Sequence, residues 1–334
     1  MPQTGFFVAT PPKVDLLEEK LPKDKGVHEL IKDIPVLLKP EIKKEAIDCI
    51  KATVNDVRTG KLIDKEGAKK VVSLLVKEVM KNYKHTLLNL IDIRHHDEYT
   101  FAHSINVCVL SILIGIKKRM EKEELEELGL GGLLHDLGKI RIEHEILNKP
   151  GKLTREEIDT MKHHPTYGYE ILCFDQEIGE IPREIAYQHH EQYDGGGYPR
   201  GLCGKDIHEY AIIAALADVY DALTTDRPYR KSFLPHDAMR IMITDTETKF
   251  SPDAIRLFLE HMSIYPVGSM VRLNSGEVAV VILSHEKALI RPTLRMILDP
   301  RGDYYPEAQE VDLRRDRKRF IVGSVGDDVF LERH

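Results

Sequence analysis

Residues 133–140 read Leu-Leu-His-Asp-Leu-Gly-Lys-Ile, in which an adjacent histidine and aspartate follow a short apolar run. Neighbouring side chains on a helix differ in direction by about 100°, so His135 and Asp136 can hold one metal ion from two sides. The carboxylate of Asp136 has two oxygens and can also reach a second ion, which a neutral imidazole cannot do. Alone, such a pair is most often a surface or capping pair, so its interpretation depends on further ligands.

Further candidate ligands stand on both sides of this pair, within one stretch of helical pattern. The full set is His103, His135, Asp136, His164, His189, His190 and Asp218. A single site uses only three or four protein ligands, so seven imply two metal ions. Imidazole and carboxylate ligands without thiolates suit transition metals better than magnesium or calcium, and we expect iron or manganese. The pair His95-His96 falls in a polar break and is interpreted as solvated.

The composition is that of an ordinary soluble globular protein: 334 residues, 42% hydrophobic and 31% charged. No apolar run is long enough to span a bilayer, and the N-terminus does not read as a secretory signal. The four cysteines are widely spaced and form no CxxC pair, which is typical of reduced thiols. The net charge of −7 argues against nucleic-acid binding but permits a small anionic substrate in one cleft. We therefore expect a cytoplasmic protein that binds neither membranes nor nucleic acid.

The hydrophobic pattern divides the chain into three regions. Residues 1–90 are lysine-rich and mostly helical in period, residues 91–262 are helical and contain all seven candidate ligands, and residues 263–334 are β-rich. The pattern predicts a mainly α protein, with a helical bundle, an N-terminal helical region and a small C-terminal β extension. Strands are predicted at residues 271–273, 278–283 and 288–291.

The N-terminal region contains two helical runs. Thr59-Gly60 separates them, and Asp64 is the predicted N-cap of the second. This region is interpreted either as a helical spacer or as a helix pair that passes an input signal or mediates formation of a homodimer.

Taken together, the motifs resemble the HD-GYP family, a branch of the HD-domain metal phosphohydrolases. The chain is similar to that family from about residue 60 to residue 315. The resemblance implies a helical bundle with a binuclear metal site in its core. It also implies a bacterial signalling enzyme that hydrolyses the phosphodiester of cyclic di-GMP to pGpG, and to GMP if the site acts again. The matching segments are residues 97–104, 133–140, 164–165, 189–191, 197–199, 217–224 and 227–230.

The resemblance also assigns roles to single residues. The first ion would take His103, His135, Asp136 and Asp218, and the second would take His164, His189 and His190, with Asp136 bridging both. Asp136 and Lys139 would serve catalysis, in which a hydroxide that bridges the two metals attacks phosphorus. The substrate cleft would be lined by Lys139, Gly197, Tyr198, Pro199, Arg227 and Arg230. Some relatives hold a third metal with a glutamate one turn before the first histidine; Tyr99 stands there, so we expect two ions.

Two alternatives to this reading stay open. In the first, the chain is a catalytically weak cyclic di-GMP receptor. In the second, it is a phosphodiesterase for a related cyclic dinucleotide. No predicted ligand is missing, which favours the enzyme. The loop of Gly197, Tyr198 and Pro199, here called the GYP loop, would contact the substrate, dock a GGDEF-type partner protein, or only shape the fold.

Overall fold

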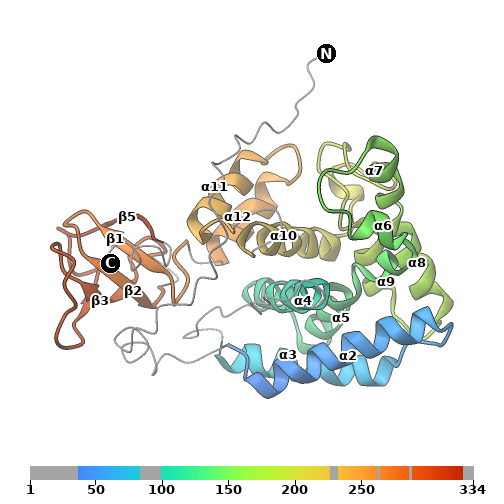
Figure 1. Ribbon diagram of the computed structural model, residues 1–334, viewed down its shortest axis with the longest axis horizontal. Coiled ribbons are helices and arrows are strands. Elements are labelled where there is room, and N and C mark those ends of the chain that lie inside the picture. Colours follow the sequence, from blue (N-terminus) through green and yellow to red (C-terminus); the bar gives the residue numbers. More distant parts are fainter. Residues whose placement is uncertain (1–36, 83–98, 226–231, 262–263, 286–287, 326–334) are drawn as a thin grey trace, which may run out of the picture.

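The computed structural model describes residues 37–82, 99–225, 232–261, 264–285 and 288–325. Its larger part is a bundle of helices, and a small sheet lies at one end (Figure 1). The helical elements are α2 (Pro40–Arg58), α3 (Lys65–Asn82), α4 (Tyr99–Lys117), α5 (Lys122–Leu134), the 3-10 helix η2 (Leu137–Arg141), α6 (His144–Leu147), α7 (Arg155–Met161), α8 (His164–Phe174), α9 (Glu180–Gln188), the 3-10 helix η3 (Gly204–Asp206), α10 (Glu209–Thr224), α11 (Pro235–Thr244) and α12 (Pro252–His261).

The N-terminal pair α2 and α3 packs against α4 and α5. Helix α2 ends at Arg58, and Gly60 takes a left-handed conformation with φ 74°, which glycine adopts without steric cost. The predicted N-cap at Asp64 is confirmed, because its Oδ1 accepts a hydrogen bond of 3.0 Å from Gly67 N. The sequence therefore encodes the turn between these two helices locally.

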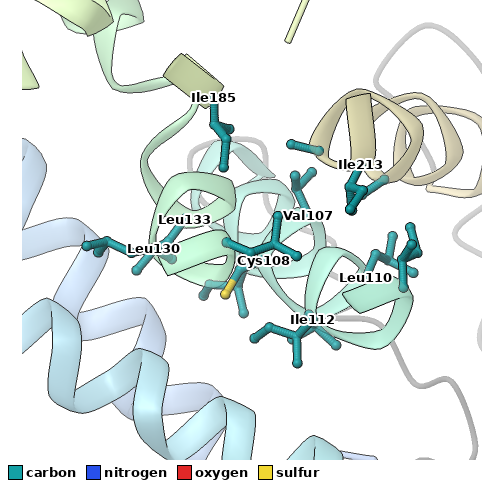
Figure 2. Packing of buried hydrophobic residues seen from close by; sticks show 14 of the residues in the cluster. Val107, Cys108, Leu110, Ile112, Leu130, Leu133, Ile185 and Ile213 are labelled. Atoms are coloured by element: carbon teal, nitrogen blue, oxygen red, sulfur yellow. The ribbon is translucent and has the colours of Figure 1, made fainter. Parts of the chain in front are cut away.

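Helix α4 forms the centre of the bundle. Its apolar side chains, Val107, Cys108, Leu110 and Ile112 among them, are at most 1% exposed. Figure 2 shows them between Leu130 and Leu133 of α5, Ile185 of α9 and Ile213 of α10. At Gly132 a Cβ would lie 3.0 Å from Cys108 Cα, so α5 approaches α4 as closely as backbone allows. This packing fixes the spacing of the helices that carry or precede His103, His135, His189 and Asp218.

The C-terminal part is a five-stranded antiparallel sheet with the order β4-β3-β2-β1-β5. One face buries Val271, Ala279, Val281, Leu294 and Met296 in a core of its own. The strands are β1 (Met270–Leu273), β2 (Val278–Leu283), β3 (Thr293–Leu298), β4 (Glu310–Asp312) and β5 (Ile321–Ser324).

Two of the three predicted strands coincide with β1 and β2, but the prediction of a strand at residues 288–291 is wrong. Arg291 N donates to Ala288 O at 2.9 Å, which closes a turn, and Ile290 is 60% exposed. The strand comes after Pro292, where Leu294 and Met296 alternate into the buried face. Burial on the sheet therefore outweighed the β propensity of the short run before it.

The fold prediction of a mainly helical protein with N-terminal helices and a small β extension is confirmed. None of the described helices combines the length and the apolar character that crossing a bilayer requires.

Candidate metal centre

His135 and Asp136 lie where α5 gives way to η2, not within one helix as the sequence suggested. His135 keeps helical angles (φ −54°, ψ −37°), whereas Asp136 turns out of the helix at φ −97°, ψ 7°. Helix η2 then packs on the start of α8, where a Cβ on Gly138 would lie 2.0 Å from His164 O. Only glycine permits this approach, which brings Asp136 beside His164.

Three of the histidines are held by backbone carbonyls through the same ring nitrogen. The Nδ1 atoms of His135 and His164 each lie 2.8 Å from a carbonyl oxygen, of Gly132 and Met161 respectively. In His189 this nitrogen lies 3.0 Å from the carbonyl oxygen of Ala186. A carbonyl only accepts, so each Nδ1 carries the hydrogen and each Nε2 keeps a lone pair. Metals bind imidazole in this form, and the backbone contact fixes both the tautomer and the orientation of the ring.

Asp136 stands between two groups of these nitrogens. Its Oδ1 lies 3.3 Å from His164 Nε2 and 3.8 Å from His189 Nε2. Its Oδ2 lies 3.4 Å from His135 Nε2 and 3.8 Å from His103 Nε2. Potential ligand atoms therefore form two clusters that share this carboxylate: one adds His164, His189 and His190, the other His103 and His135.

The surroundings of Asp136 are suited to bind cations. Its Oδ1 is buried and accepts no hydrogen bond, because the imidazole nitrogens that face it carry no hydrogen. A buried carboxylate oxygen without a partner is costly in free energy. His164 Nε2 and His189 Nε2 also face each other at 3.2 Å, lone pair toward lone pair. Divalent ions would satisfy both arrangements, so the residues fit a metal site.

His103 is held at both ring nitrogens by carboxylates of α10. Its Nε2 lies 3.1 Å from Asp218 Oδ1, and its Nδ1 lies 2.7 Å from Asp221 Oδ2. Asp221 is fully buried and also accepts hydrogen bonds from Asn106 Nδ2 at 2.8 Å and Thr225 Oγ1 at 2.9 Å. Sequence reasoning gave Asp221 no role. The available signal was its spacing three residues after Asp218, which places both carboxylates on one face of α10.

Burial and charge set the protonation of the centre. Burial lowers the pKa of His190 to about 3 and also lowers the pKa of His135 and of His189, so these rings are neutral at pH 7. Burial raises the pKa of Asp136, but the positive charge of Lys139 opposes this effect, and the pKa lies well below its ordinary value. Burial lowers the pKa of His103, yet hydrogen bonds to Asp218 and Asp221 raise it to about 10. His135, His189, His190 and Asp136 are therefore in the form that binds metal, and an ion would displace the His103 proton.

The GYP loop folds back onto the histidine pair. The Tyr198 ring stacks on the His190 ring, with centroids 4.8 Å apart and planes at 27°, and Tyr198 N donates to His190 O at 3.1 Å. The next residue, Glu191, is buried and accepts hydrogen bonds from Arg200 N at 2.7 Å and Leu202 N at 2.9 Å. These contacts tie the loop to the segment that carries His189 and His190. Pro199 follows Tyr198 through a cis peptide bond.

Gly197 is needed for a contact within the chain. A Cβ at this position would lie 2.3 Å from Gln192 N and 2.5 Å from Glu191 Cα. Gly197, which the resemblance places in the substrate cleft, therefore lets the loop pack closely against its own backbone.

We expect Gly197→Ala to lower the free energy of unfolding by about 1–3 kcal/mol, because the added methyl group forces the loop off Glu191. Gly323→Ala is the matched control, since a Cβ there meets nothing within 4 Å. Urea unfolding of both variants measures the difference. Equal stability of the two variants would contradict the steric role of Gly197.

The remaining predicted residues fall in two classes. Lys139 lies on η2 and forms an ion pair with Asp136 Oδ2. Arg227 and Arg230, together with His95-His96, lie outside the described residues. Their predicted roles stay predictions.

Comparison with known proteins places this arrangement in a family. A family model described as HD domain matches residues 86–254, and one described as KOW domain associated with HD domain matches residues 270–328. The cyclic di-GMP phosphodiesterase PA4108 of Pseudomonas aeruginosa is 36% identical over 286 residues, which are 84% of this chain and 69% of that protein. The cyclic di-GMP phosphodiesterase response regulator RpfG of Xanthomonas campestris is 36% identical over 54% of this chain, but the match spans only 49% of RpfG.

A solved structure shares the fold. Bd1817, an HDG"Y"P protein from Bdellovibrio bacteriovorus, superimposes with a TM-score of 0.54 at 23% identity, covering 65% of this chain and 68% of that one. The predicted resemblance is confirmed: the chain is an HD domain protein, related to the HD-GYP cyclic di-GMP phosphodiesterases.

Proposed function

We propose that this protein hydrolyses cyclic di-GMP to pGpG at a centre of two divalent transition-metal ions that share Asp136. The observation that carries the proposal is the position of Asp136, whose two oxygens face two separate groups of imidazole nitrogens. When bound, two such ions lower the pKa of a water molecule and offset negative charge on a phosphate. The assignment of the seven ligands is part of this proposal, as is the preference for iron or manganese.

The chain's own residues prepare the site for a phosphodiester. The tautomers fixed at His135, His164 and His189 keep Nε2 unprotonated toward the centre. Lys139 is ion-paired with Asp136, and its ammonium would move from Asp136 to a phosphate oxygen of the bound substrate or to the leaving 3′-oxygen. Tyr198 offers an aromatic face beside the centre. Burial raises the pKa of its hydroxyl, which stays protonated and can donate a hydrogen bond at neutral pH.

The choice of cyclic di-GMP rests on the relatives. PA4108 and RpfG are named cyclic di-GMP phosphodiesterases, and the match with PA4108 covers 84% of this chain. The proposal also includes further hydrolysis of pGpG to GMP and action in the cytoplasm. It includes a homodimer through α2 and α3, and a GGDEF-type partner protein that binds the GYP loop.

The decisive experiment combines elemental analysis with a turnover assay on one sample. We expect about two transition-metal ions per chain, and loss of cyclic di-GMP hydrolysis on chelation that added metal reverses. A panel with cyclic di-AMP and cyclic GMP-AMP compares substrates. Binding of cyclic di-GMP without turnover would point to the receptor, faster turnover of another cyclic dinucleotide would change the substrate, and full activity of metal-free protein would refute the centre.

A further inference from the structure

We propose that Lys162, whose ammonium lies over the Tyr198 ring, binds the second phosphate of the substrate. This inference rests on the proposed function, because it requires a substrate with two phosphodiester groups. It adds to the proposed cleft a residue that lies outside the motif segments named above. It concerns how a cyclic dinucleotide is distinguished from a simple phosphodiester.

Lys162 and the metal centre are connected through Tyr198. The ammonium Nζ of Lys162 lies 5.6 Å from the centre of the Tyr198 ring. That ring stacks on His190 at 4.8 Å and meets His164 edge to face at 6.4 Å. An ammonium within about 6 Å of an aromatic ring is attracted to its face. The Tyr198 ring therefore contacts both the candidate ligands and the Lys162 ammonium.

The backbone that carries Lys162 is the one that orients His164. Lys162 follows the last residue of α7, where its N–H donates to Ile158 O at 3.0 Å. The preceding residue, Met161, accepts the hydrogen bond from His164 Nδ1 at 2.8 Å. The segment is also closed by His163 N, which donates to Thr160 O at 3.1 Å. The position of Lys162 relative to the centre is thus set by a short, hydrogen-bonded stretch of chain.

Charge distinguishes Lys162 from the cations of η2. Lys139 is ion-paired with Asp136, and Arg141 with Glu170. Lys162 is exposed and forms no ion pair with any residue that the structure describes. A cyclic dinucleotide brings two separate negative charges, and only one can meet the ions and Lys139. An exposed lysine beside the aromatic face provides a flexible point charge for the other.

The experiment compares Lys162→Met with wild-type protein loaded with metal. We expect the KM for cyclic di-GMP to rise about tenfold, while kcat stays within about twofold. Tenfold is the lower end of the loss in affinity when a charged contact is removed, and we expect this end because the Lys162 side chain is exposed. Bis(p-nitrophenyl) phosphate has a single phosphate, so its hydrolysis should not change. The KM difference should shrink in high salt, and Lys162→Arg should recover most of the loss. Lys152→Met, an exposed lysine just before the other end of α7, is the matched control.

Each outcome separates this inference from the proposed function. An active wild-type protein whose KM is unchanged in Lys162→Met refutes the phosphate contact. An equal loss of activity on both substrates would show that Lys162 only supports Tyr198, and would also refute the phosphate contact. If wild-type protein does not hydrolyse cyclic di-GMP, its binding of that nucleotide is measured by calorimetry. Weaker binding to Lys162→Met than to wild type would support the phosphate contact. No binding to wild type would refute both proposals.

Discussion

Asp136→Ala should reduce turnover of cyclic di-GMP by at least about a thousandfold, because the loss of one shared ligand disturbs both ions. Each oxygen of this carboxylate faces a different pair of imidazole nitrogens, at 3.3 and 3.8 Å on one side and 3.4 and 3.8 Å on the other. No other described residue belongs to both clusters of potential ligands. Metal content should therefore fall at both positions.

His164→Ala is the matched comparison, because His164 belongs to only one cluster. We expect this variant to lose mainly one ion and to retain the other with His103 and His135. Elemental analysis and turnover of both variants, with circular dichroism to establish folding, make the test. Near-normal activity of Asp136→Ala, or equal metal contents in the two variants, would show that Asp136 is not shared.

Loss of the Asp136 carboxylate also has an effect on stability that metal can reveal. Without ions, the variant no longer buries an oxygen that lacks a hydrogen-bond donor, and Lys139 loses its ion pair. We therefore expect added metal to raise the melting temperature of the wild-type protein far more than that of the variant, because only ligands that bind the native state stabilise it.

The sequence predicted the parts of this molecule that depend on local pattern. The helical period, the N-cap at Asp64 and the strands β1 and β2 all follow from residues close in the chain. The set of histidines and aspartates could be named because each belongs to a short motif. Six of the seven lie in two clusters, in each of which the potential ligand atoms are within 4.8 Å of one another. The seventh, Asp218, lies beside His103.

What sequence could not predict depends on contacts between distant segments. The break of the helix between His135 and Asp136 follows from the packing of Gly138 on α8. Strand β3 lies after Pro292 because a buried face is available there. In each case the tertiary partner, not the local preference, decides the conformation.

Asp221 is the clearest example of such a contact, since it meets His103 across 118 residues of chain at 2.7 Å. One of its oxygens, Oδ1, accepts from both Asn106 Nδ2 and Thr225 Oγ1. In Asp221→Asn the remaining oxygen is best placed toward these two donors. The new amide group then faces His103 Nδ1 and donates to it. That hydrogen bond would force the ring proton onto Nε2, the nitrogen proposed to bind metal.

We therefore expect Asp221→Asn to bind metal about 10–100-fold more weakly at the His103 position, with a matching loss of turnover, while the His164 position keeps its ion. Thr225→Val is the control, because it removes one hydrogen bond to Asp221 and leaves the contact with His103 unchanged. Metal titrations of both variants measure the affinities, and nitrogen NMR of the imidazoles reports the tautomer. Two ions bound with wild-type affinity in Asp221→Asn would show that this carboxylate does not position His103, whereas a weakened site with the proton on Nε2 would establish that it does.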